Sequence, residues 1–204
     1  MYLRSLLALS LCLVPITVCG RAGDSSNADP EPTGETRAET RPSGDFETAG
    51  SIDATLGGEA RSWTVLRGET ERGPASTSTY RTREAFRSTA HMLTLDGHSG
   101  TRPGTRDMIS LSINTGEPLD GCPCALEHQT IEYYVSFSEV YRTRDAQIVL
   151  ERFEPAGDGW YEAAGRFSGT LAPAEESEGA RGGEPMPIEG AFAIQGVQFR
   201  DDAP

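Results

Sequence analysis

The feature that most constrains the fold of this 204-residue chain is an alternation of apolar and polar residues with a period of two. The clearest example is a segment in which Ile109, Leu111 and Ile113 alternate with Ser110 and Ser112. Such alternation gathers the apolar side chains on one face of an extended strand, because successive side chains of a strand point to opposite faces. Helical spacing is hard to find after the first fifty residues. The pattern therefore predicts a body built from strands.

Turn signals separate the alternating segments and predict where strands end. Gly57–Gly58 follows the alternating run Ile52–Leu56 and predicts a hairpin, because glycine tolerates the positive φ of tight turns. Asp96–Gly97 and Pro155–Gly159 are further turn signals. We count about eight or nine strands, of which Tyr80–Arg87 is the least regular. These features predict an all-β chain, folded as an antiparallel β-sandwich or a partly open barrel.

Three glycines interrupt the apolar faces of the last two expected strands. Gly165 and Gly169 share the phase of the apolar residues around them, which predicts that another backbone or a large ring approaches closely. Val197 and Phe199 are out of phase with the apolar residues before them, so an extra residue must be absorbed. Gly196 is our candidate for this β-bulge.

The first 19 residues predict an export signal that precedes the folded body. Arg4 leads into a nearly unbroken apolar run, Ser5–Val18. This run is shorter than the about 20 apolar residues that a membrane-spanning helix needs, and Pro15 disturbs its end. We therefore expect a cleaved signal peptide.

The segment Ile16–Gly20 resembles the lipobox of bacterial lipoproteins, whose cysteine is lipidated and becomes the first residue after cleavage. The resemblance implies lipid attachment at Cys19 and an envelope location, on the outer membrane or the periplasmic face, with the membrane as a partner. Cleavage after Gly20 by an ordinary signal peptidase is the alternative, and it would give a secreted protein.

Two segments are too polar to bury a core. Residues 20–50 consist mainly of Asp, Glu, Ser, Thr, Pro and Gly, which predicts a disordered acidic linker. Residues 172–187 have the same chemistry and are expected to form a long flexible loop within a single domain, 51–204. Such segments carry most of the formal charge of −13. An acidic chain does not neutralise phosphates, so we expect no nucleic-acid partner.

Three parts of the body carry a resemblance to a known class of proteins. They are the opening hairpin with Trp63, the segment Gly165–Thr170 and the closing segment Gly190–Phe199. Together they resemble small secreted or lipid-anchored bacterial β-sandwich proteins of unknown function. The resemblance implies the fold and the extracytoplasmic location, and it brings no catalytic residue.

Cys122 and Cys124 form the most specific local motif. In an oxidising compartment a disulfide between them is our first interpretation, because the other two cysteines lie in the signal region. The alternative is a metal site in which both thiolates and His128 bind Cu or Zn. Two thiols and one imidazole are fewer ligands than a structural zinc site uses, so no cofactor is assigned.

The sequence contains no convincing catalytic constellation. Ser99 sits in a glycine-rich loop without the G-x-S-x-G spacing and following helix of a nucleophile elbow. His98 is expected to be exposed in that loop, and His91 is expected to be a strand residue with a local hydrogen-bond partner. The chain is accordingly expected not to be an enzyme, and a hydrolase is the least favoured of three function classes.

Arg81, Arg83 and Arg87 would share one face of a strand, where they could bind carboxylates or phosphates of a surface polysaccharide. Cross-strand pairing with Asp or Glu is the simpler interpretation. The expected protein is a lipid-anchored, noncatalytic binding or structural module of the cell envelope, with a polysaccharide or a protein as its partner. The alternative is a metal-handling periplasmic protein.

Overall fold

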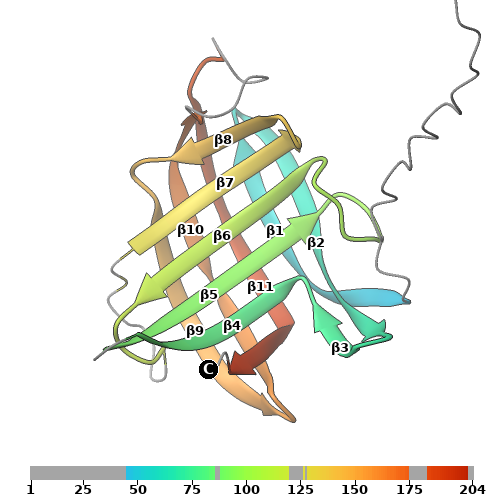
Figure 1. Cartoon of the computed structure of the whole chain (residues 1–204). Helices are drawn as coiled ribbons and strands as arrows, with labels where there is room; N and C mark the ends of the chain where they lie inside the picture. Colours follow the sequence, from blue (N-terminus) through green and yellow to red (C-terminus); the bar gives the residue numbers. More distant parts are fainter. Residues whose placement is uncertain (1–44, 86–87, 120–125, 127, 175–182, 202–204) are drawn as a thin grey trace, which may run out of the picture. The chain divides into compact units, whose positions relative to one another are not determined.

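The computed structural model describes residues 45–85, 88–119, 126, 128–174 and 183–201 (Figure 1). All of these residues belong to one compact unit, Thr40–Pro204. The described residues form eleven strands and no helix, which confirms the all-β fold class. The strands are β1 (Phe46–Leu56), β2 (Glu59–Thr70), β3 (Gly73–Ser76), β4 (Ser78–Ala85), β5 (Ser88–His98), β6 (Met108–Thr115), β7 (His128–Ser136), β8 (Glu139–Thr143), β9 (Gln147–Gly157), β10 (Trp160–Pro173) and β11 (Met186–Asp201).

The strand count exceeds the expected eight or nine because two strands are very short. β3 has four residues and β8 has five, too few for an alternation to stand out in the sequence. In the described residues no helix could span a membrane.

All eleven strands belong to one sheet, in the order β3-β2-β1-β11-β4-β5-β6-β7-β8-β10-β9. The pairings are antiparallel except that of β11 with β4, which is parallel. The sheet is therefore mixed, and this parallel pair departs from the antiparallel expectation. It joins the last described strand to the fourth, a long-range arrangement that local alternation does not encode.

The sheet folds back on itself so that two groups of strands face each other. In Figure 1, β5, β6, β7 and β8 cross in front of β1, β2, β10 and β11. Further ladder contacts connect the two groups: β8 pairs with the end of β10, and Thr64 of β2 pairs with His98 of β5. The core lies between them and draws buried residues from both, including Ile52, Trp63, Leu111 and Phe192.

The predicted bulge in the last strand is confirmed. Between Tyr161 and Ala163 of β10, the partner strand β11 advances from Val197 to Ile194, which leaves one extra residue at Gln195–Gly196. The extra residue changes the phase of the strand, so that Ile194 and Val197 are both buried. This is how β11 keeps apolar residues in the core along its whole length.

The close approach predicted at Gly165 is also confirmed, and it is one half of a reciprocal arrangement. Gly165 of β10 is opposite Phe192 of β11, and Phe167 of β10 is opposite Gly190 of β11. A Cβ on Gly165 would lie 2.7 Å from Phe192 Cζ, and a Cβ on Gly190 would lie 2.8 Å from Phe167 Cζ. Each phenylalanine ring thus fills the space that the opposite glycine leaves empty. At Gly169, the methyl group of Thr143 makes the close approach.

Strand boundaries differ from the expected ones at several places. β1 begins at Phe46, inside the segment expected to be linker, and the strands β10 and β11 include both ends of the expected loop 172–187. β5 continues through Asp96–Gly97 to His98. Phe137, expected to continue the apolar face of its strand, is 85% exposed, because it lies in the turn between β7 and β8.

We predict that Gly165→Ala lowers the free energy of unfolding by about 1–3 kcal/mol, the usual cost of overpacking a filled core. The added methyl group would meet the Phe192 ring and the backbone carbonyl of Val149, which a side-chain rotation cannot move. Urea unfolding followed by tryptophan fluorescence measures the change. Gly116→Ala is the matched control, because no atom lies within 4 Å of its added Cβ. Equal stability of the two variants would contradict the reciprocal packing.

Candidate functional site

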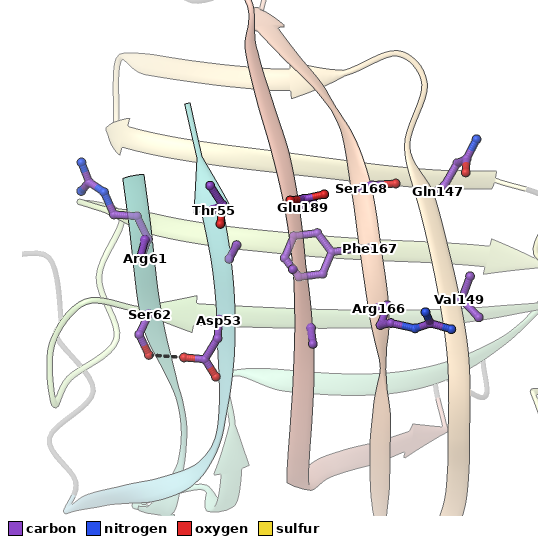
Figure 2. Close-up of a pocket in the computed structure, with 14 residues that line it drawn as sticks. Asp53, Thr55, Arg61, Ser62, Gln147, Val149, Arg166, Phe167, Ser168 and Glu189 are labelled. Atoms are coloured by element: carbon purple, nitrogen blue, oxygen red, sulfur yellow. Dashed lines mark hydrogen bonds between the residues drawn. The ribbon is translucent and has the colours of Figure 1, made fainter. Parts of the chain in front are cut away.

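An open groove of about 900 Å³ lies on the outward face of β1, β11 and β10. Figure 2 shows Arg61 and Ser62 on one side of it and Gln147 and Val149 on the other. The lining residues are Asp53, Ala54, Thr55, Ala60, Arg61, Ser62, Gln147, Val149, Arg166, Phe167, Ser168, Glu189, Gly190 and Ala191. We refer to this surface as the outer groove.

The outer groove is hollow because its central strand carries small residues. On β11 the exposed residue at the middle of the groove is Ala191, which pairs with Asp53 of β1 on one side and Arg166 of β10 on the other. The ladder continues outward to Ser62 and Val149, so longer side chains stand on both sides of a short one. Alternation along the strands puts all five on the outward face.

Hydrogen bonds fix part of the wall of the groove. The Asp53 carboxylate accepts one hydrogen bond from Ser62 Oγ at 2.6 Å (Figure 2) and another from Ser51 Oγ at 2.8 Å. On the other side, Arg166 Nε donates to Glu151 Oε1 at 2.7 Å. The groove itself holds two carboxylates and two guanidinium groups, so its formal charges cancel although the chain is acidic.

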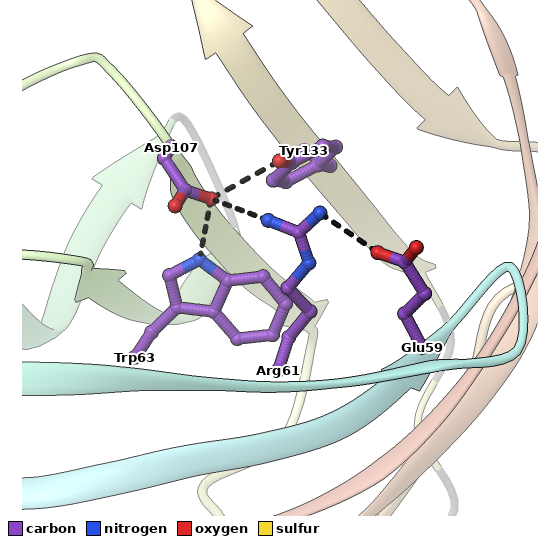
Figure 3. Close-up of polar contacts among 5 residues, drawn as sticks. All are labelled: Glu59, Arg61, Trp63, Asp107 and Tyr133. Atoms are coloured by element: carbon purple, nitrogen blue, oxygen red, sulfur yellow. Dashed lines mark hydrogen bonds and ion pairs between the residues drawn. The ribbon is translucent and has the colours of Figure 1, made fainter.

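Arg61 connects the groove to a partly buried cluster of polar contacts around Asp107 (Figure 3). Asp107 Oδ1 accepts hydrogen bonds from Trp63 Nε1 at 3.2 Å and from the Tyr133 hydroxyl at 3.0 Å. Arg61 Nη1 lies 3.9 Å from the same oxygen, and Arg61 Nη2 lies 3.2 Å from Glu59 Oε2. The Trp63 and Tyr133 rings also meet edge to face, with centroids 6.0 Å apart. We call these five residues the Asp107 cluster.

The Asp107 cluster lies beside a weak seam of the sheet. β2 and β5 are joined there by the single pair Thr64 and His98, and the connection after β5 folds back over the gap. Ser99 N donates to the Asp107 carbonyl at 3.2 Å, and Asp107 adopts a φ of 48°, in the left-handed region that aspartate tolerates. The Asp107 carboxylate therefore links Trp63 of β2 to Tyr133 of β7. The cluster is structural support for the wall that carries Arg61.

Burial raises the pKa of Tyr133 to about 12, and the neighbouring Asp107 carboxylate adds to the shift. A phenol that loses its proton next to this carboxylate would replace a hydrogen bond by a repulsion between two negative charges. The cluster thus holds Tyr133 in its protonated form.

The cysteine predictions lie outside the described residues. This applies to the lipid-attachment residue Cys19 and to Cys122 and Cys124, whether as a disulfide or as metal ligands. His128, the third metal candidate, is exposed at the start of β7. Within the described ranges, no group of three His, Cys, Asp or Glu side chains is placed to hold a metal ion. Both cysteine hypotheses stay predictions.

The two other histidines have clear surroundings. His91 is buried, and its Nδ1 lies 2.8 Å from the Tyr80 hydroxyl, which confirms the expected local hydrogen bond. The prediction that His98 is exposed is wrong. This residue is only 6% exposed, and its Nδ1 lies 2.9 Å from the Gly104 carbonyl oxygen. Burial lowers the pKa of His98. The neighbouring Ser99 is exposed, outside any cavity described here.

The arginine stripe is only partly described. Arg81 is half-buried on β4, Arg83 is exposed on the same face, and Arg87 lies outside the described residues. The sequence alone did not indicate Arg61 and Arg166 of the outer groove, nor Asp107. Each of them owes its importance to contacts between strands far apart in the chain, such as Trp63 with Asp107.

The raised pKa of Tyr133 predicts how stability depends on alkaline pH. Because the folded-state pKa of about 12 exceeds the ordinary value of 10, its stabilising contribution is complete below pH 10 and is lost as pH rises toward 12. The chain has no lysine, so tyrosines dominate the titration in this range. Urea unfolding between pH 9 and 12 should show a smaller loss of stability for Tyr133→Phe than for the natural sequence. An identical loss in both would contradict the assignment.

No family model, no curated protein and no solved structure matches the chain. Any assignment of function therefore begins from the outer groove and from the N-terminal sequence.

Proposed function

We propose that this protein is a noncatalytic binding module of a bacterial cell envelope, anchored by a lipid on Cys19, and that the outer groove binds an uncharged, hydroxyl-rich ligand such as a segment of a neutral polysaccharide. The observation that carries the proposal is the chemistry of the groove: balanced charges, many hydrogen-bonding groups and a floor of small residues. A ligand without charge suits a surface without net charge.

The side chains of the groove support binding of a polar, uncharged ligand. The groove offers carboxylates, guanidinium groups, hydroxyls and an amide, which together can donate to and accept from sugar hydroxyls. Its open form leaves these groups accessible to a ligand.

The location rests on the N-terminal sequence. The apolar run after Arg4 and the lipobox-like segment that ends at Cys19 support export and lipid attachment, and the polar segment that follows would hold the body away from the bilayer. A polysaccharide of the envelope is a ligand that such a module would meet.

A bulky side chain on the floor of the groove should block the ligand. We expect Ala191→Trp to weaken the binding of a neutral polysaccharide at least about tenfold, equivalent to about 1.4 kcal/mol. Affinity electrophoresis through gels that contain a neutral glucan, a neutral mannan or an acidic alginate measures the effect. Asn114→Trp is the control, because Asn114 is exposed on β6 and does not line the groove.

The result that overturns the groove proposal is retardation by none of the neutral polysaccharides, or retardation that Ala191→Trp leaves unchanged. Stronger retardation by alginate than by either neutral polymer would also contradict it, because the proposal rests on cancelled charges.

Lipid attachment is tested separately in cells. Globomycin, which blocks the lipoprotein signal peptidase, should cause an unprocessed precursor to accumulate, and Cys19→Ser should prevent labelling with a radioactive fatty acid. Normal processing in the presence of globomycin would contradict the anchor and favour cleavage after Gly20. This result would leave the groove proposal intact.

A further inference from the structure

A second hollow adjoins the outer groove on the same face of the sheet. Its volume is about 460 Å³, and it reaches Gly58 in the turn between β1 and β2. Four residues line both the outer groove and this second hollow: Thr55, Gln147, Ser168 and Glu189. We call the second hollow the groove extension.

The register of the strands places the four residues that line both hollows in one row. Thr55 of β1 pairs with Glu189 of β11, which also pairs with Ser168 of β10. Ser168 in turn pairs with Gln147 of β9. Figure 2 shows the four side chains in this order across four neighbouring strands. We call these four residues the shared row.

The shared row is the middle of one continuous surface. On β10, Arg166 of the outer groove and Thr170 of the groove extension each lie two residues from Ser168. Alternate residues of a strand share a face and are about 7 Å apart. The surface between the level of Arg166 and the level of Thr170 is therefore about 14 Å long.

The shared row has unused hydrogen-bonding capacity. Within the part of the chain that the structure describes, none of its four side chains forms a hydrogen bond or an ion pair with another residue. Ser168 is half-buried, and the other three side chains are exposed. Two hydroxyls, an amide and a carboxylate can both donate to and accept from the hydroxyls of a sugar. A ligand that lies across the row would therefore meet polar groups that the fold does not use.

A fixed carboxylate lies at the far end of the groove extension. Asp145 accepts a hydrogen bond from Thr170 N at 2.8 Å and another from Thr170 Oγ1 at 3.2 Å. A carboxylate can accept about four hydrogen bonds, so Asp145 can still accept from a ligand. Asp145 and Glu189 are carboxylates that line the extension, and no arginine is among its described lining residues. This end of the surface therefore favours a ligand that donates hydrogen bonds and disfavours an acidic one.

The volumes of the two hollows exceed what one sugar unit fills. A hexose has twelve non-hydrogen atoms, and it takes less than about 360 Å³ even if each atom occupies the ~30 Å³ of one liquid water. The groove extension has a volume of about 460 Å³ and the outer groove one of about 900 Å³. The outer groove therefore has room for two such units, and the extension has room for one.

We infer that the outer groove and the groove extension together bind one segment of a neutral polysaccharide that is at least three consecutive sugar units long, with the shared row in contact with a middle unit. This inference rests on the proposed function and specifies the length of the ligand. A shorter fragment leaves part of the polar surface without a partner, so the affinity rises with the length of the fragment.

The experiment is a calorimetric titration of the purified full-length chain with a disaccharide and a hexasaccharide, prepared from both the neutral glucan and the neutral mannan of the electrophoresis experiment. The hexasaccharide of the polymer that binds should bind at least about tenfold more tightly than its disaccharide, equivalent to about 1.4 kcal/mol. A site for two units alone would gain only about fivefold, or about 1 kcal/mol, because a hexasaccharide contains five overlapping disaccharides.

Pro187→Trp tests the groove extension separately from the outer groove. Pro187 is exposed on β11 and lines the extension but not the outer groove. A tryptophan there should remove the gain of the hexasaccharide and leave the affinity for the disaccharide unchanged. Asp145→Ala, which fills no space, should reduce the same gain. Pro74→Trp is the matched control, because Pro74 is an exposed strand proline that lines neither hollow.

Circular dichroism checks the folding of each variant. A ratio between hexasaccharide and disaccharide affinities of about fivefold or less would overturn the inference, and so would equal ratios in Pro187→Trp and Pro74→Trp. In both cases, disaccharide binding that Ala191→Trp abolishes would still support the outer groove alone. The absence of binding by every one of these oligosaccharides would contradict the proposed function together with the inference.

Discussion

The reciprocal contact between two glycines and two phenylalanines joins the strands on which the rest of the sheet depends. β11 pairs with β1, β4 and β10, and β10 pairs with β8, β9 and β11, so these two strands connect both sides of the core. Each ring lies over the glycine of the other strand, which fills the core without forcing the two backbones apart. On the opposite face the same stretch of β11 carries Ala191, so one strand both closes the interior and forms the floor of the outer groove.

Much of the fold could be predicted because alternation is a local signal. The strand around Ile109, Leu111 and Ile113 is β6, and the change of phase before Val197 located the bulge at Gln195–Gly196. Two features could not be predicted from the sequence, because each is formed by strands that lie far apart in the chain. Nothing near Asp107 in the sequence shows that Trp63 and Tyr133 donate to it, and nothing near Arg81 shows that Arg200 lies beside it.

The candidate sites were less accessible to sequence reading than the fold. The cysteine motif drew attention because its spacing is unusual, whereas the residues of the outer groove are ordinary strand residues whose meaning depends on register. His98 is a second example. Its glycine-rich neighbourhood predicts an exposed side chain, but the loop folds back, and the Gly104 carbonyl oxygen lies within hydrogen-bond distance of the imidazole. A groove whose formal charges cancel, on a chain of net charge −13, shows that local arrangement, and not total charge, determines what a surface attracts.

The position of β11 in the chain also affects how the molecule reaches its native state. The last described strand is the partner of early ones; the contact between Ser76 and Gly196, for instance, spans 120 residues. During synthesis, β1 and β4 leave the ribosome long before the strand that will lie between them. Their unpaired edges stay open until the C-terminal segment arrives, which makes closure of the sheet a late and slow event. A chaperone that covers these strand edges during that interval would prevent them from pairing with other chains.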